Sequence, residues 1–328
     1  MALSRRALWP LLGGAVAGAL TVSVAEAADD FPTKPIRLIV PYPPGGSADL
    51  IARLVAEQLS ASTGQSVVVE NKGGASGSIG SEYVAHARPD GYTILMTTSD
   101  TLAINPAVFA HLPYDPQKDF APISLLAVQP FVLAVGPSVT AKDFAAFVQN
   151  AKDKPGTVSF ASNGAGGVQH LAMELLASSA GFKALHVPYN GAGPALSDVM
   201  GGHVDAIFIS LQGAGGSIRA GQLRALAISS PTRLTIAPDI PTFTELGFPA
   251  FQVQQWYALV APRATPPAVL ATLNRLVAAA MRVPALADKL NAVGTQPIGS
   301  TEEALRDFIA HDAAQWSAVA KANNIKIE

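Results

Sequence analysis

The feature that most constrains the fold is a strand-like run, a glycine turn and an amphipathic helix pattern that follow one another directly. The apolar run Ile36–Val40 leads into the turn Pro41–Asp49, whose sequence is PYPPGGSAD. Helical spacing of the apolar residues that follow predicts a helix over Ser47–Thr63. Such a turn points backbone N–H groups at a ligand, and the positive end of the helix dipole favours an anion. Because the turn contains no lysine or arginine, an anion bound here would be held mainly by the backbone.

A second unit of the same kind follows later in the chain. The strand-like run Thr157–Ala161 leads into the turn Ser162–His170, of sequence SNGAGGVQH, and a helix is expected over Val168–Ala180. Two such units predict two similar lobes that face one another. No linker rich in proline, glycine or serine separates them. We therefore expect two apolar, extended segments, Leu125–Val135 and Gln252–Val260, to cross between the lobes as strands.

Strand-like and helix-like segments alternate along most of the chain. The further expected strands are Ser66–Glu70, Tyr92–Thr97, Leu185–Val187, Asp205–Ile209 and Leu223–Ile228, and the further expected helices are Ile79–Ala87, Ala141–Lys152, Pro194–Gly201, Gly213–Ala220, Pro267–Met281, Pro284–Val293 and Thr301–Ala322. This alternation is typical of α/β architecture with mostly parallel sheets. The last quarter is expected to be mainly helical.

Composition narrows the class of protein. The 328 residues are enough for two lobes with buried cores, and 49% of them are hydrophobic while only 14% are charged. The net charge is −2 and no basic stripe is present, which argues against a nucleic-acid partner. The chain has no cysteine, which excludes disulfides and thiolate metal sites.

The first 27 residues have the pattern of a signal peptide. A short basic start, Ser4–Arg6, precedes the apolar stretch Leu8–Val24, and Ala25-Glu26-Ala27 offers small residues where an export peptidase cleaves. A membrane anchor is the less favoured interpretation, because the uninterrupted apolar core is shorter than the ~20 residues that a span needs. The twin arginines partly resemble a twin-arginine export signal, and ordinary secretion stays equally open. We expect a periplasmic protein whose signal peptide is cleaved near Ala27.

Motifs of the common enzyme classes are absent from the sequence. There is no G-x-G-x-x-G, no Walker motif, no G-x-S-x-G and no H-E-x-x-H. The six histidines are scattered and show no metal-ligand spacing. The sequence therefore predicts a protein that is not an enzyme and uses no cofactor or metal ion, with a hydrolase kept as a remote alternative.

Each candidate segment also has a purely structural interpretation. In the first turn, the two glycines can simply supply positive φ angles, with Ser47 as helix cap and Asp49 in the first helical turn. A lone histidine within a helix, such as His170, is more often packed than ligand-binding. The polar run Thr97–Asp100 and the segment Val187–Leu196 are, taken singly, best explained as turns.

The chain resembles a known family through many separate motifs. They are Pro35–Arg37, the Pro41–Asp49 turn, Val69–Lys72, Ala87–Thr93, Leu112–Asp115, Lys118–Pro122, Tyr189–Asp205, Arg219–Leu226, Pro238–Thr242, and Trp256 with Ala261-Pro262. These resemble the Bug-type receptors, the extracytoplasmic solute-binding proteins of tripartite tricarboxylate transporters. The resemblance covers nearly the whole chain after the signal peptide, in order.

The resemblance implies a fold and a function. The fold would be an α/β, two-lobed periplasmic binding protein of type II, the Venus flytrap, with two crossovers between lobes. Lobe 1 would comprise 28–127 and 251–328, and lobe 2 would comprise 128–250. The protein would capture a small carboxylate (a di- or tricarboxylate, an acidic amino acid or an aromatic acid) and deliver it to a tripartite transporter. A sensor or orphan receptor that signals through a membrane partner is the alternative, and we expect a monomer.

The family's ligand contacts can be carried over residue by residue. They imply that the ligand-binding residues are Tyr42, Gly45, Gly46, Asp49, Ser99, Ser162, Asn163, Gly164, Gly166, His170, Tyr189, Gly191, Asp205 and Trp256. Asp49 is an acid in a site for acids, so we expect it to contact a ligand amine or a bridging water, or to hold the turn by accepting backbone N–H groups.

Several residues depart from the family pattern, so the identity of the ligand stays open. Gly167 stands where many members have serine, and Met173 replaces a small residue. Phe208–Gln212 lacks an Asp or Asn that is often found there, and Gly213–Gly216 is unusually rich in glycine. These positions belong to the expected cleft or its wall, so the substrate cannot be inferred from that of a relative.

Overall fold

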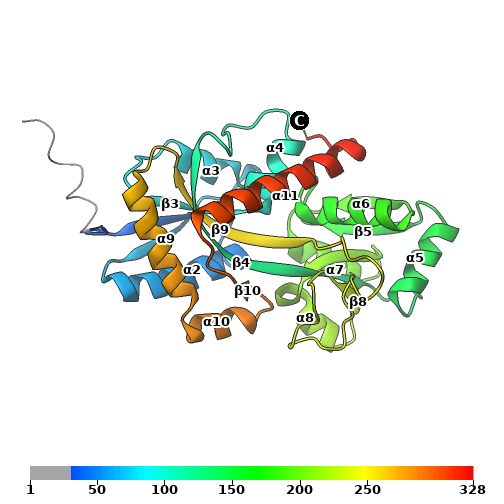
Figure 1. Cartoon of the computed structure of the whole chain (residues 1–328). Helices are drawn as coiled ribbons and strands as arrows, with labels where there is room; N and C mark the ends of the chain where they lie inside the picture. Colours follow the sequence, from blue (N-terminus) through cyan, green and yellow to red (C-terminus); the bar gives the residue numbers. More distant parts are fainter. Residues whose placement is uncertain (1–30, 328) are drawn as a thin grey trace, which may run out of the picture. The chain divides into compact units, whose positions relative to one another are not determined.

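The structure is a computed structural model that describes residues 31–327, and the elements below lie in one compact unit that begins at Pro32 (Figure 1). In chain order they are β1 (Ile36–Val40), α2 (Ser47–Thr63), β2 (Val67–Asn71), η1 (Ala75–Gly77), α3 (Ser78–Ala85), β3 (Thr93–Thr98), η2 (Asp100–Ile104), α4 (Asn105–Val108), β4 (Phe120–Val135), α5 (Phe144–Asp153), β5 (Val158–Ser162), α6 (Val168–Ala180), β6 (Ala184–Pro188), α7 (Ala192–Met200), β7 (Ala206–Ser210), α8 (Leu211–Arg219), β8 (Arg224–Ile228), β9 (Gln254–Pro262), α9 (Pro267–Met281), α10 (Pro284–Asn291), β10 (Gln296–Pro297) and α11 (Glu302–Ala322). The predicted signal peptide, 1–27, lies outside the described residues.

The strands form two groups. In the first strand group, β1 pairs in parallel with β2 and β3, and β9 runs antiparallel to β3. In the second strand group, β5 pairs in parallel with β6 and β7. The expected α/β class is confirmed. The antiparallel pairs involve the long strands β4 and β9.

Strand β4 belongs to both groups (Figure 1). Its part from Phe120 to Pro130 pairs antiparallel with β9, and its part from Phe131 to Val135 pairs antiparallel with β7 and β8. The chain therefore crosses between the groups within β4, as the sequence predicted for Leu125–Val135. The expectation that Gln252–Val260 also crosses as a strand is wrong. Among the described residues, strand β9 pairs only with β3 and with the first-group part of β4, so the return crossing is made by the loop before it, 229–253. The lobe boundaries at 127/128 and 250/251 stay a prediction.

The alternation of side chains along the strands builds two hydrophobic clusters. In β7, Phe208 belongs to a large cluster that includes Ile39 of β1 and Trp316 of α11. Ile207 and Ile209, which point the other way, belong to a smaller cluster within the second strand group. Helix α11 runs across β4 and β9 and covers that side of them (Figure 1).

The helical ends match the local sequence chemistry. Helix α2 begins at Ser47, as predicted, and ends at Gly64, which adopts φ 68° and closes the last turn. Thr301 caps α11 by accepting a hydrogen bond from the Ala304 N–H, which confirms the predicted helix start. The helical stretch from Asp100 to Val108 was not predicted, and it opens with a π-helical turn.

Among the described residues no single helix is both long and apolar enough to cross a membrane. One bent pair, α9 with α10, passes that test only when the two helices are joined.

Candidate functional site

The first glycine turn leaves a helix N-terminus open. Gly45 adopts φ 91°, and Gly46, the residue before α2, has extended backbone with no side-chain cap. Both glycines are exposed, and a Cβ placed on either would meet no atom within 4 Å. The first N–H groups of α2 have no intrahelical partner, so they are free to bind an anion there.

Asp49 is buried and holds this turn together. Its carboxylate accepts the Gly45 N–H at 3.0 Å, the Asn71 amide at 3.0 Å and the Arg53 guanidinium at 3.0 Å. Burial by itself would raise the pKa of the Asp49 carboxyl, but the hydrogen bonds from Arg53, Gly45 and Asn71 hold it below its usual value. Of the roles expected for Asp49, the contacts match the one in which it accepts a backbone N–H and fixes the turn.

The end of β3 lies beside the first turn. The Tyr42 hydroxyl shares a hydrogen bond of 2.6 Å with the Thr98 hydroxyl. The next residue, Ser99, is fully buried, and its hydroxyl has no partner among the described residues. A buried polar atom without a partner is costly in a folded protein, so Ser99 stays a candidate for contact with a bound group.

Asp100 connects the end of β3 to the second turn. One carboxylate oxygen accepts the Val168 N–H at 3.0 Å, at the first residue of α6, and the other accepts the Gln255 amide of β9 at 3.3 Å. The positive end of the α6 dipole therefore carries a carboxylate of the chain itself.

The second turn is folded tightly around its own polar groups. The Ser162 hydroxyl bonds the Gly164 carbonyl at 2.9 Å, and Gln169 accepts the Asn163 N–H at 3.0 Å. Gly164 and Gly166 have φ of 157° and 75°, so the turn uses glycine where its backbone needs it.

Two histidines stack beneath this turn. The rings of His170 and His186 lie 3.7 Å apart at 12°, and His186 also stacks on Phe160. His170 Nδ1 accepts the Gly166 N–H, and His186 shares a 2.6 Å hydrogen bond with Ser162. Burial lowers the pKa of both rings to about 4, and for His170 the neighbouring His186 adds to the effect. Both histidines are therefore neutral near pH 7.

The Ser162–His186 contact does not extend into a catalytic triad. The other ring nitrogen of His186 has no hydrogen-bond partner among residues 31–327, so no carboxylate orients the ring. Within the same residues, no group of three or more histidine, aspartate or glutamate side chains is arranged to hold a metal ion.

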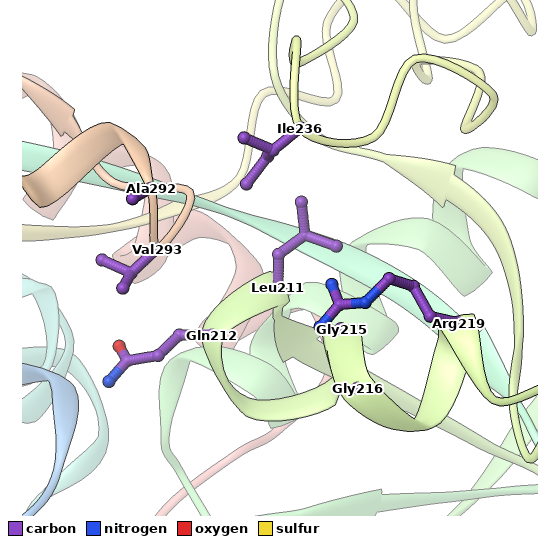
Figure 2. A pocket seen from close by; sticks show the side chains of 8 residues that line it. All are labelled: Leu211, Gln212, Gly215, Gly216, Arg219, Ile236, Ala292 and Val293. Atoms are coloured by element: carbon purple, nitrogen blue, oxygen red, sulfur yellow. The ribbon is translucent and has the colours of Figure 1, made fainter. Parts of the chain in front are cut away.

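A second contact joins the two halves of the site through Gln212 of α8. The Ser47 hydroxyl donates to the Gln212 amide oxygen at 2.6 Å, and the Gln129 amide of β4 lies 3.4 Å from the same oxygen. Behind Gln212, a cavity of about 200 Å³ opens between the glycine-rich face of α8 and the turn at Ala292 and Val293 (Figure 2). Figure 2 also shows the Arg219 side chain lying along Gly215 at the edge of this cavity.

Comparison with known proteins identifies the family. Residues 51–325 match the model of the tripartite tricarboxylate transporter family receptor. Protein BugT of Bordetella pertussis is 37% identical over 94% of this chain and 94% of its own. The chain belongs to this receptor family.

Solved structures agree in fold with the receptor. A protein described as a periplasmic transporter is 43% identical with a TM-score of 0.82, over 91% of this chain and 100% of its own. A Rhodopseudomonas palustris protein solved with adipate is 33% identical with a TM-score of 0.82, over 90% and 99% of the two chains. MatC of the same species, with bound malate, is 31% identical with a TM-score of 0.77, over 88% and 99%. The predicted two-lobed receptor fold is thereby confirmed.

Most of the predicted site residues of the receptor lie in the two turns or against them. The Tyr189 N–H donates to the Ser162 carbonyl at 3.0 Å, and the Gly191 N–H donates to the Asn163 carbonyl at 3.2 Å. The third glycine segment is thus attached to the second turn. The Tyr189 hydroxyl itself bonds Asp198 of α7.

Two predicted residues lie elsewhere. Asp205 precedes β7 and bonds Ser138 and Ser159, at the opposite end of the second strand group from Ser162. Trp256 is buried on the α11 side of β9, where its indole N–H donates to Asp312 at 2.6 Å. The structure does not bring these two side chains to the turns.

The two neighbours of Trp256 in β9, rather than Trp256 itself, lie in the region of the expected site. Because successive side chains on a strand point to opposite faces, Gln255 and Tyr257 lie on the side away from α11. Gln255 bonds Asp100, and the Tyr257 hydroxyl bonds Gln129 at 3.0 Å. The alternation within β9 could have shown this. Gln212 and Asp100 appeared in the sequence only within longer segments, Phe208–Gln212 and Thr97–Asp100, and no pattern singled out either residue.

A larger cavity lies away from the turns. It measures about 780 Å³ and opens near the start of β1 and β3, with Arg37 and Tyr83 in its wall. Arg37 already forms an ion pair with Glu70, at 2.6 Å. The glycine turns lie at the other end of β1.

Proposed function

We propose that this receptor captures a small carboxylate between the turns Pro41–Asp49 and Ser162–His170. The observation that carries the proposal is that each turn contacts an element of the opposite strand group. Ser47 of the first turn bonds Gln212 of α8. Val168 of the second turn bonds Asp100, which follows β3. The open N-terminus of α2 supplies N–H donors and a positive dipole end for the carboxylate. The adipate and malate found with two solved relatives are ligands of this chemical class.

Capture would proceed by closure of the two lobes. A ligand that contacts both turns stabilises the closed arrangement and shifts the population toward it. The contacts that close the site are few and polar, so they can break when the lobes separate. No side chain in the site combines an activated nucleophile with an oriented base, and we propose binding without turnover.

We further propose that the protein works in the periplasm, after cleavage of residues 1–27 near Ala27, and hands its ligand to a tripartite transporter in the membrane. Membership of the receptor family supports this placement. The ligand-binding residues would be those of the two turns together with Ser99, Tyr189 and Gly191.

A thermal-shift screen tests the proposal directly. A carboxylate at a hundred times its Kd should stabilise the closed protein by about 2.7 kcal/mol, which raises Tm by several degrees. Native mass spectrometry of freshly purified protein should reveal any acid that is retained. If no member of a broad carboxylate panel raises Tm and no acid co-purifies, carboxylate capture is rejected.

A further inference from the structure

The carboxylate of Asp100 has an unusual environment. Its two oxygens accept the backbone N–H of Val168 and the side-chain amide of Gln255, and the backbone N–H of Asp100 itself also contributes. Among the described residues no lysine, arginine or histidine forms an ion pair with it. Burial raises the pKa of Asp100. The hydrogen bonds from Val168 and Gln255 lower this pKa, but by less than burial raises it.

Asp49 shows how the same protein stabilises a buried carboxylate that holds a turn together. Asp49 is buried, and the Arg53 guanidinium pairs with it. Asp100, by contrast, keeps some solvent exposure and lacks a cation. A partly buried carboxylate without a cationic partner is favourable only when another group supplies donors or positive charge.

The position of Asp100 relates it to both turns. It follows Ser99, whose buried hydroxyl has no partner, and it touches the first N–H of α6. Tyr42 of the first turn bonds Thr98, two residues before Asp100, so we place the far end of a ligand held at the N-terminus of α2 near Asp100. The α6 terminus, which would otherwise favour a second carboxylate, is already occupied by the chain's own negative charge.

We propose that Asp100 is a specificity-determining residue that excludes a second carboxylate and selects a monocarboxylate carrying an ammonium or hydroxyl group at its far end. The proposal rests on the proposed function, since it assigns the second end of the ligand in the same site. An ammonium group at that end supplies the cation that Asp100 lacks, and a hydroxyl group supplies a further hydrogen-bond donor. A carboxylate there meets a like charge in a site that is poorly screened by water.

Pairs of ligands with equal chain length test whether the site prefers a donor group or a second carboxylate at the far end. Suitable pairs are 4-aminobutyrate with succinate, 5-aminovalerate with glutarate and 6-aminohexanoate with adipate, with the hydroxy acid of each length as a third member. Calorimetric titration should show the amino or hydroxy acid binding the wild-type receptor more tightly than the diacid, by about tenfold or more in the pair that fits best. Asp100→Asn should reduce that ratio by about tenfold or more, because the amide keeps the size and the acceptor while the charge is lost.

Two further variants serve as checks. Asp100→Ser removes the charge with a smaller side chain and should shift the ratio in the same direction, even if Asp100→Asn folds poorly. Asp307→Asn removes the same charge at an exposed position of α11 and should leave the ratio unchanged. Tm without ligand reports the folding of each variant.

The outcomes separate this proposal from the proposed function. Diacids that bind the wild-type receptor as tightly as their amino and hydroxy partners overturn the role of Asp100 but leave carboxylate capture intact. If neither Asp100→Asn nor Asp100→Ser changes the ratio of the two affinities, the role of Asp100 is likewise overturned and carboxylate capture stands. Absence of binding by every carboxylate, in the wild-type receptor and in all variants, rejects both proposals.

Discussion

The two glycine turns share a sequence pattern but differ in what fills them. The first turn is open: a Cβ placed on Gly46 would meet no atom within 4 Å. The second turn is packed, since a Cβ on Gly166 would lie 3.0 Å from Ile327. The first turn is fixed by an acid from its own helix, Asp49, whereas the second is capped by Asp100 from the other strand group. Similar local sequences therefore give one turn with an open helix N-terminus and one whose helix N-terminus is capped by a carboxylate of the chain.

The largest expected effect comes from filling the open turn. Gly46 has φ −80°, which any residue can adopt, so Gly46→Val should fold normally. Its side chain would occupy the space in front of the α2 N-terminus, and we expect carboxylate binding to weaken by about a hundredfold or more. Calorimetry and Tm measure the two effects separately. Ala61→Val, which adds bulk on an exposed part of the same helix, is the control and should bind like wild type.

A large loss of stability is expected when the anchor of the first turn is removed. Asp49→Ala leaves the Gly45 N–H and the Asn71 amide without their acceptor, so the free energy of unfolding should fall by about 2–3 kcal/mol. Urea denaturation measures this. Arg53→Ala should cost less, because the Arg53 side chain is exposed to water. Equal losses for the two variants would contradict the assigned role of Asp49.

As the pH falls, the second turn should lose stability before the first turn does. Both His170 and His186 have a pKa of about 4 in the folded protein, below the ordinary 6.5, so the unfolded chain binds protons more readily between these values. Their contribution to stability is complete above pH 6.5 and is lost as the pH falls toward 4. We expect Tm to drop by several degrees from pH 7 to pH 5. The double variant His170→Gln, His186→Gln should show a flatter profile, and an unchanged slope would disprove the assignment.

The smallest effect is expected at the contact between the first turn and α8. Gln212→Ala removes the acceptor of the Ser47 hydroxyl, which is one neutral hydrogen bond worth about 1 kcal/mol. Ligand affinity should therefore fall about fivefold, with little change in Tm. A loss as large as that of Gly46→Val would mean that Gln212 contacts the ligand directly.

Much of this comparison could be predicted from the sequence, because local patterns determine local structure. The glycine turns, their helices and the strand that crosses between groups follow from apolar periodicity and turn residues. Signals for the placement of Asp205 and Trp256 were also present in the sequence, but the expectation for these two residues did not use them. Asp205 lies one residue before a strand whose other end faces the site, and Trp256 lies one residue from Gln255 on a strand where neighbours point to opposite faces.

The partners of acidic side chains depend on contacts between distant segments. Asp49 was the expected acid of the site, but Arg53, one helical turn away, neutralises it. Asp100 appeared only as the end of a polar run after a strand. Its contact with Val168 joins residues that are far apart in sequence and depends on how the two strand groups meet.

Hydrogen exchange measured with and without a bound carboxylate tests the central claim most directly. If the ligand lies between the turns, backbone amides 45–50 and 163–168 should both become protected on binding. The segments around Arg37 and Tyr83, which line the larger cavity, should exchange at unchanged rates. Protection confined to those segments, or to one turn alone, would contradict capture between the two turns.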